Sequence, residues 1–307
     1  MTTEMKAAIY RKGRRGKVLE ITDLEQPIPK DNEVLLRVHA ASVNPLDWRM
    51  KSPRPGVDVA GQVVAVGRAV TQFKPGDAVL GAGRGTFAEY ACAAETNLAL
   101  KPESVTFVQA AAIPIAGLTA LQGLRDKGGL QPRQKVLING AAGGIGTFAV
   151  QIAKSFGADV TGVCSTKNVE LVRSLGADRV IDYTHDDFTL GSERYDLLLD
   201  NVGNRTLSAM KRVLRPDGKC IMAGAPKKLS AVFARIFKAF ARSLFLRQRF
   251  TFFVAKIKRD DLTTLCELMK DEKLIAVIDR QYPLAESSAA IAYVEEGHAR
   301  AKVILTP

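Results

Sequence analysis

The sequence predicts an α/β protein with two domains, a small β-barrel and a doubly wound parallel sheet. A chain of 307 residues suits about two domains. The first third contains short strand patterns separated by Gly and Pro, which is typical of a barrel. The middle of the chain alternates short apolar runs with helical patterns, which indicates a parallel sheet with helices on both faces.

Two runs in the first third alternate and are rich in branched residues, 33–43 (EVLLRVHAASV) and 57–66 (VDVAGQVVAV). Turn residues separate these strands from their neighbours, among them Pro53, Pro55 and the tetrapeptide 74–77 (KPGD). A helix over 260–270 precedes two further strand-like pieces, 276–281 and 301–305. We expect these late strands to rejoin the N-terminal barrel.

The pattern changes after Pro114. We expect helices over 117–125, 144–156 and 169–175, and strands over 135–139 (KVLIN), 159–164, 180–182, 195–200 and 219–223. Strands and helices of these lengths form a doubly wound sheet. The predicted division is a barrel domain of residues 1–112 and 259–307 and a second domain of residues 113–258.

The composition is that of a soluble globular protein, with 47% apolar and 25% charged residues. No run approaches the roughly 18 apolar residues of a membrane span, and we find no secretory signal. The four cysteines are scattered without the two-residue spacing of a metal knuckle or redox motif. These features predict a cytoplasmic protein with free thiols and no structural zinc.

The strongest motif is a glycine-rich turn between the strand KVLIN and a helix, with Gly140, Gly143 and Gly146 three residues apart. A strand that turns sharply into a helix can bring backbone N–H groups and the positive helix end close to a diphosphate, provided that no β-carbon intervenes. A glycine-rich turn alone is only a tight loop, but in this context it predicts dinucleotide binding. The predicted contacts are Gly140, Ala142, Gly143, Gly144, Ile145 and Gly146.

The end of the second strand of this domain distinguishes NAD from NADP. NAD sites usually carry Asp or Glu there to hold the ribose hydroxyls, whereas this chain has the segment 164–167 (CSTK). Ser165 and Lys167 can donate to a 2′-phosphate, and Tyr183 after the next strand adds a hydroxyl. The sequence therefore predicts NADPH, although Lys167 could simply be a solvated residue that opens a helix.

Several motifs together resemble the zinc-independent quinone oxidoreductase branch of the medium-chain dehydrogenase/reductase superfamily. They are the glycine turn and the segments 42–48 (SVNPLDW), 57–61 (VDVAG), 85–90 (GTFAEY), 116–121 (AGLTAL), 200–203 (DNVG) and 297–300 (GHAR). These segments occur in the expected order over nearly the whole chain. The resemblance implies a GroES-like barrel fused to a Rossmann domain, with the active site in the cleft between them, and it suggests a homodimer.

The resemblance also implies roles for individual residues. Asn44 and Asp47 would face the nicotinamide or substrate, and Thr119 would contact the cofactor near its nicotinamide end. The nicotinamide ribose would be lined by Val202, Gly203 and Gly224. Ordinary alternatives exist, because Asn44 can belong to a turn, Asp47 can cap a helix and Thr119 can bond its own backbone. Asp58 has the character of a structural residue that caps a neighbouring turn.

A catalytic zinc needs about three protein ligands that converge on one site. The only histidines are His39, His185 and His298, in different contexts, and Asn44 stands where the zinc-dependent relatives begin their ligand set. We therefore expect no metal. Without a metal to stabilise an alkoxide, conjugated acceptors are easier to reduce than isolated ketones.

These inferences predict an NADPH-dependent oxidoreductase that transfers hydride to quinones or α,β-unsaturated carbonyls. The alternative is a non-catalytic NADPH-binding protein that uses a basic segment to contact nucleic acid or membranes. A chain with both Asn44 and Thr119 in place favours the enzyme, because a binding module needs neither.

Two features depart from the expected pattern. The net charge of +12 is concentrated in 227–259, which holds ten Lys or Arg residues and no Asp or Glu. Within it, 229–246 has an apolar face and a basic face, which predicts a packed helix or a weak anionic-membrane contact through 229–249, with nucleic acid disfavoured. In addition, the stretch 48–57 is short for the family, so either the cleft is more open or the sequence lacks residues there, and Ala301 stands where Gly is common.

Overall fold

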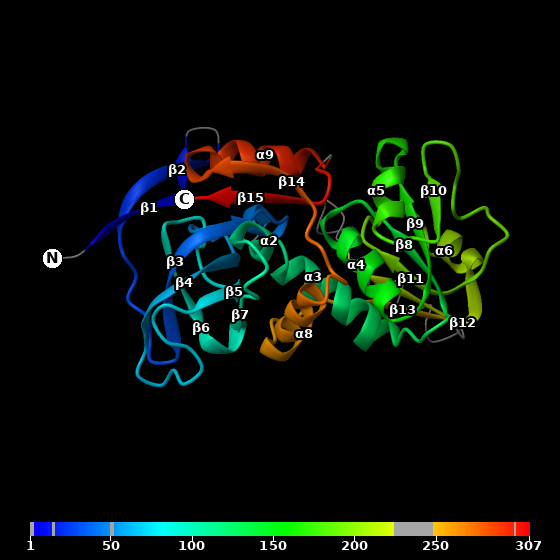
Figure 1. Cartoon of the computed structure of the whole chain (residues 1–307). Helices are drawn as coiled ribbons and strands as arrows, with labels where there is room; N and C mark the ends of the chain where they lie inside the picture. The colour runs from blue at the N-terminus through cyan, green and yellow to red at the C-terminus, as the bar shows by residue number, and fades with distance from the viewer. Residues whose placement is uncertain (1–2, 14–15, 50–51, 224–247, 298) are drawn as a thin grey trace. The chain divides into compact units, whose positions relative to one another are not determined.

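The computed structural model describes residues 3–13, 16–49, 52–223, 248–297 and 299–307 (Figure 1). The chain forms two compact units, each with its own core. Unit 1 contains Met1–Leu118 and Lys256–Pro307, and unit 2 contains Thr119–Ala255. Unit 1 is therefore built from two separated stretches of sequence.

Unit 1 is mainly β. An antiparallel hairpin of β1 (Glu4–Gly13) and β2 (Gly16–Glu25) precedes the main strands. A seven-stranded sheet follows the order β14-β15-β3-β4-β5-β7, and β6 also pairs with β3. Its strands are β3 (Glu33–Ser42), β4 (Asp58–Val66), β5 (Ala78–Ala82), β6 (Tyr90–Ala94), β7 (Leu98–Leu100), β14 (Ile278–Pro283) and β15 (Lys302–Thr306).

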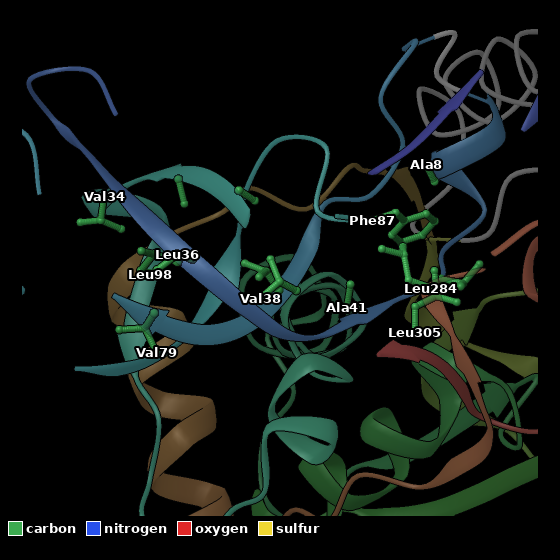
Figure 2. Packing of buried hydrophobic residues seen from close by; sticks show 14 of the residues in the cluster. Ala8, Val34, Leu36, Val38, Ala41, Val79, Phe87, Leu98, Leu284 and Leu305 are labelled. Atoms are coloured by element: carbon green, nitrogen blue, oxygen red, sulfur yellow. The ribbon is translucent and has the colours of Figure 1, made fainter. Parts of the chain in front are cut away.

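The helices assigned to unit 1 are short. They are α1 (Leu46–Arg49), α2 (Phe107–Ala111), α8 (Arg259–Lys270) and α9 (Ser287–Glu296), and α3 (Pro114–Gln122) begins in this unit. The start of α2 is fixed by a capping box in which Thr106 and Gln109 satisfy each other's backbone N–H groups. The core lies between the strands, with Leu36, Val79 and Leu98 fully buried (Figure 2).

Unit 2 contains a six-stranded sheet in the order β10-β9-β8-β11-β12-β13, in which all pairs are parallel. Its strands are β8 (Lys135–Asn139), β9 (Asp159–Cys164), β10 (Arg179–Asp182), β11 (Tyr195–Asp200), β12 (Leu214–Met222) and β13 (Arg249–Phe252). Its helices are α4 (Gly144–Ser155), α5 (Val169–Ser174) and α6 (Leu207–Val213). The order reverses between β8 and β11, which is where nucleotides bind in doubly wound sheets.

The structure confirms the predicted fold class and the return of the late strands to unit 1, because β15 pairs with both β14 and β3. One predicted helix differs. In place of a single helix over 117–125, α3 runs from Pro114 to Gln122 and continues as a π-helix, Gly123–Gly128. Proline is well accepted at a first helical position, and Gly123 packs closely against Leu199 and Phe253.

No helix in the described part of the chain is long and apolar enough to cross a membrane. The predicted amphipathic helix over 229–246 lies outside the described residues, as do Gly224 and His298.

Candidate functional site

The first candidate site is the turn from β8 into α4. Gly140 has φ 81°, a left-handed conformation that a glycine adopts without strain. A methyl group at Gly146 would overlap the carbonyl oxygen of Gly140 and the backbone of Ala141, so the helix packs against the turn only because Gly146 has no side chain. The spacing of the glycines therefore has the steric cause that the sequence predicts.

The helix start also has room for a charged group. Gly143 is the N-cap residue, no side chain caps α4, and the first helical hydrogen bond runs from Thr147 N to Gly143 O. The N–H groups of the first turn consequently have no partner within the helix. Among the described residues, a methyl group at Gly143 would meet only the Gly140 oxygen, at 3.4 Å, so the space directly beside this N-cap position is not filled. These residues fit the diphosphate of a dinucleotide.

The predicted phosphate-selecting residues lie together at the carboxyl ends of two neighbouring strands. Cys164 of β9 is the register partner of Asp182 of β10, and Tyr183 N donates to Cys164 O at 2.9 Å. Ser165 and Lys167 follow directly after β9, where Lys167 is exposed, and the side chain of Tyr183 is 53% exposed. The structure thus brings Ser165, Lys167 and Tyr183 to one edge of the sheet.

Sequence reasoning missed an acidic residue at this edge. The Asp182 carboxylate accepts hydrogen bonds from Thr184 N at 2.9 Å and Thr184 Oγ1 at 2.7 Å. A hydrogen bond from Thr166, followed by those from Thr184, lowers the pKa of Asp182. Its position at the end of the third strand, instead of the second, is the reason that the search for an NAD-type acid did not consider it.

The turn after β11 lies against the glycine turn. The side chain of Val202 would collide with a methyl group at Gly140, and Gly203 has φ 76°. This turn is held by Asp200, whose Oδ1 accepts from the N–H groups of Val202 and Gly203 at 3.2 and 2.9 Å and from Asn139 Nδ2 at 2.9 Å. Val202 and Gly203 therefore adjoin the predicted diphosphate site. Gly224 lies outside the described residues.

A second candidate site lies in unit 1, where polar side chains form a buried cluster. Asn44 is 4% exposed, Asp58 is fully buried and the Lys302 side chain is 3% exposed. Asn44 Nδ2 donates to Asp58 Oδ2 at 2.8 Å and to the Ser42 carbonyl oxygen at 3.2 Å. Lys302 Nζ donates to Asn44 Oδ1 at 2.7 Å and lies 3.7 Å from Asp58 Oδ2.

Asp58 has more partners than a simple turn cap. Its Oδ2 also accepts from Ser42 Oγ at 2.6 Å, and its Oδ1 accepts from Ile115 N at 2.9 Å, at the start of α3. The predicted capping role therefore describes one oxygen of this carboxylate, while the other is shared by Ser42, Asn44 and Lys302. Sequence reasoning did not consider Lys302 as a site residue. A lone lysine in the apolar strand 302–306 is the signal that could have found it, because a buried cation requires a partner.

Asp47 is the second predicted residue of this cluster. Its Oδ2 accepts from Asn44 N at 2.7 Å, and Asp47 N donates to Asn44 O at 2.9 Å, which closes a tight turn at the start of α1. Its Oδ1 is buried and has no hydrogen-bond partner among the described residues. Burial, assisted by the nearby Asp58 carboxylate, raises the pKa of Asp47 to about 7.

Thr119 lies within α3 and is 8% exposed. Among the described residues, no three His, Cys, Asp or Glu side chains gather closely enough to hold a metal ion. Since His298 is not among those residues, the predicted independence of metal stays a prediction, as do the roles of Asn44, Asp47 and Thr119.

A parallel sheet with a glycine-lined helix start at its switch point defines unit 2 as a dinucleotide-binding domain. Comparison with known families agrees. Residues 30–103 match the alcohol dehydrogenase GroES-like domain, and residues 175–305 match the family described as zinc-binding dehydrogenase.

Individual relatives cover nearly the whole chain. A chloroplast envelope quinone oxidoreductase homologue from Arabidopsis thaliana is 36% identical over 97% of this chain and 96% of its own length. An NADPH-dependent alkenal/one oxidoreductase of the same plant is 32% identical over 99% of this chain and 80% of its own length. The solved quinone oxidoreductase of Coxiella burnetii is 30% identical, with a TM-score of 0.88 over 99% of this chain and 100% of that one.

The chain therefore belongs to the quinone oxidoreductase branch of the medium-chain dehydrogenase/reductase superfamily. It is an oxidoreductase that uses a nicotinamide cofactor, and the resemblance noted from its motifs is confirmed.

Proposed function

We propose that this protein transfers a hydride from NADPH to quinones or α,β-unsaturated carbonyls. The observation that carries the proposal is the open, uncapped start of α4 behind Gly140 and Gly143, which suits a dinucleotide diphosphate. The names of two relatives, a quinone oxidoreductase homologue and an NADPH-dependent alkenal/one oxidoreductase, support the choice of acceptor.

In this proposal, residues of unit 1 stabilise the negative charge that develops on the hydride acceptor. Bound NADPH supplies the hydride. Addition to a conjugated acceptor spreads negative charge onto its oxygen, which one or two hydrogen-bond donors can stabilise. Asn44 orients that oxygen by exchanging one of its amide hydrogen bonds, to Asp58 or to Ser42 O, for one to the acceptor. Asp47 in its protonated form adds no opposing negative charge, and water supplies the proton.

An acceptor screen tests this function. NADPH oxidation is followed by absorbance with a panel of quinones and enones, beside a direct titration of NADPH binding. We expect turnover with at least one conjugated acceptor. Tight NADPH binding without turnover on any acceptor would instead indicate a non-catalytic NADPH-binding protein, and a failure of both NADPH and NADH to bind would refute the dinucleotide site.

We propose NADPH rather than NADH because Ser165, Lys167 and Tyr183 gather at the ends of β9 and β10. Substitution Lys167→Ala removes an ammonium that can bind a 2′-phosphate, so we expect roughly tenfold weaker NADPH binding with NADH binding unchanged. Titration of both cofactors measures the effect. Lys127→Ala, at an exposed lysine before β8, is the matched control. Equal loss for the two cofactors would contradict phosphate selection by Lys167, and Asp182 would then require testing as a ribose ligand.

A further inference from the structure

We propose that Lys302 is a positioning residue of the Asn44–Asp47 turn, whose buried ammonium, paired with Asp58, determines which way the Asn44 amide faces. This inference rests on the proposed function for its kinetic consequence, but its structural part stands on the contacts alone. Lys302 is separated from Asn44 by 258 positions in the sequence. Strand β15 brings it there by pairing Ile304 with Ser42 of β3.

The orientation of the Asn44 amide follows from the donors and acceptors around it. An ammonium has only N–H donors, so it must face the amide oxygen, and an ionised carboxylate has only acceptors, so it must face the amide nitrogen. Lys302 Nζ lies 2.7 Å from Asn44 Oδ1, and Asp58 Oδ2 lies 2.8 Å from Asn44 Nδ2. Rotation of the amide by 180° would place its NH2 group against the Lys302 ammonium and its oxygen against the Asp58 carboxylate. Donor would then face donor, and acceptor would face acceptor.

The same contacts hold the turn that carries Asp47. The backbone of Asn44 exchanges two hydrogen bonds with Asp47, one from Asn44 N to Asp47 Oδ2 and one from Asp47 N to Asn44 O. Val43 N, immediately before the turn, donates to Val303 O, immediately after Lys302. Side chain and backbone of β15 therefore fix the turn from two sides.

The charges in this cluster are mutually dependent. Burial lowers the pKa of Lys302, and the carboxylates of Asp58 and Asp47 oppose that shift. Burial, and to a smaller extent the Asp58 carboxylate, raises the pKa of Asp47, and the charge of Lys302 opposes that rise. Burial raises the pKa of Tyr10, and the charges of Asp47 and Glu295 raise it further. Loss of the Lys302 charge should therefore raise the pKa of Asp47 further, provided that the turn keeps its place.

Three variants distinguish a positioning role of Lys302 from a role that only balances the charge of Asp58. Lys302→Met removes donor and charge, Lys302→Gln keeps an N–H donor without the charge, and Lys302→Met with Asp58→Asn restores neutrality without the donor. We expect kcat to fall roughly 10- to 100-fold in Lys302→Met, with NADPH affinity unchanged, and Lys302→Gln to recover part of the loss. The double variant should recover stability but not kcat. Val79→Ala, in the core of the same unit, controls for instability alone.

Recovery of kcat together with stability in the double variant would overturn the proposal, because Lys302 would then only balance the charge of Asp58. An unchanged kcat in Lys302→Met would overturn it as well. A crystal structure of Lys302→Met gives a readout that needs no activity, and we expect the Asn44 amide to be turned or the Asn44–Asp47 turn to be displaced. An unaltered turn in that crystal refutes positioning even if no acceptor is ever reduced, whereas a displaced turn with no turnover in the parent protein refutes only the proposed function.

Discussion

Asp47 is a carboxylic acid that folding makes harder to ionise. Its pKa rises from an ordinary 3.8 to about 7, chiefly because the side chain is buried. Between these two pH values the unfolded chain loses the proton and the folded chain keeps it. The unfolded state then binds fewer protons, so this residue makes the free energy of unfolding fall as pH increases.

We predict that Asp47→Asn removes this dependence, since the amide oxygen can still accept from Asn44 N. The parent protein should lose up to about 1.4 kcal/mol of stability per pH unit between about 4 and about 7 relative to the variant, and denaturant unfolding over that range measures the difference. The turnover of the parent should also decline above pH about 7 as a charged Asp47 opposes the charge on the acceptor. A parallel course of the two stability curves would show that Asp47 titrates normally.

The same variant distinguishes two roles of Asp47 in catalysis. If Asp47 only has to be uncharged, Asp47→Asn keeps most of the activity and lacks the decline at alkaline pH. If Asp47 itself gives the proton, the activity falls by roughly 100-fold or more at every pH.

Ala301, next to Lys302, has φ 66°, in the left-handed region. This conformation costs a residue with a β-carbon about 1–2 kcal/mol, while glycine adds about 0.5–1 kcal/mol of unfolded-state entropy. We therefore predict that Ala301→Gly stabilises the protein by about 0.5–1 kcal/mol and raises Tm by ~1–3 °C in a thermal scan. A lowered Tm would mean that packing of the buried Ala301 methyl group outweighs the backbone strain.

The residues of the glycine turn were predictable from the sequence, because their spacing reflects a local steric requirement. The partnership of Asn44 with Lys302 was not, because nothing local to either residue specifies a contact across 258 positions. Asp58 lies between these cases. Its cap on Ile115 matches the expectation of a structural acid, but its bond to the Asn44 amide depends on the pairing of β3 with β4.

At the scale of elements, we expect two glycines of the strand–turn–helix unit of β8 and α4 to have different roles. Gly146 is needed for folding, and Gly143 is needed for cofactor binding. We predict that Gly146→Ala lowers stability by about 2 kcal/mol or more, because its methyl group would overlap backbone atoms that cannot move aside. Gly143→Ala should fold normally, since φ is −83° there and only the Gly140 oxygen is near, yet its methyl group should weaken NADPH binding at least tenfold. Denaturation and NADPH titration of both variants check this contrast. Equal effects on folding would show that the space at Gly143 is not available.

Strand prediction succeeded best where a strand is buried on both faces. β8, β9 and β11 have the predicted bounds, because continuous apolar runs leave little choice of secondary structure. β12 begins at Leu214, five residues before the predicted start, and includes Pro216 and Gly218, two residue types that are uncommon inside strands. β13 was not predicted at all. Its four residues lie within the basic segment 227–259 and form a strand by pairing with β12.

At the scale of the whole molecule, each unit has its own core, but only unit 2 holds the predicted diphosphate site. We predict that NADPH at 100 times its Kd raises the free energy of unfolding by about 2.7 kcal/mol, because the unfolded chain cannot bind it. NADH at the same concentration should give a smaller shift in Tm. Gly143→Ala, if it binds NADPH at least tenfold more weakly, should gain no more than about 1.4 kcal/mol at the same NADPH concentration. Thermal scans with and without cofactor measure these shifts. A shift of equal size in Gly143→Ala would mean that the nucleotide binds elsewhere.

The predicted domain boundaries, the homodimer, the cytoplasmic location and the role of the basic segment 227–259 stay predictions. They concern long-range partners, and charge and periodicity along one chain do not specify those. The two-domain α/β architecture could be predicted because alternation of period two and strand–helix repeats are local properties of the sequence.

The pairing of β15 with β3 has a consequence for how the protein is made. A ribosome translates all of unit 2 between the two strands, so the nucleotide domain can complete its sheet while unit 1 still lacks its last strand. Until residue 302 emerges, Asp58 has no lysine to offset its charge, and burying that carboxylate is unfavourable. A chain that ends before β15 therefore lacks both the strand that pairs with β3 and the lysine that offsets the charge of Asp58.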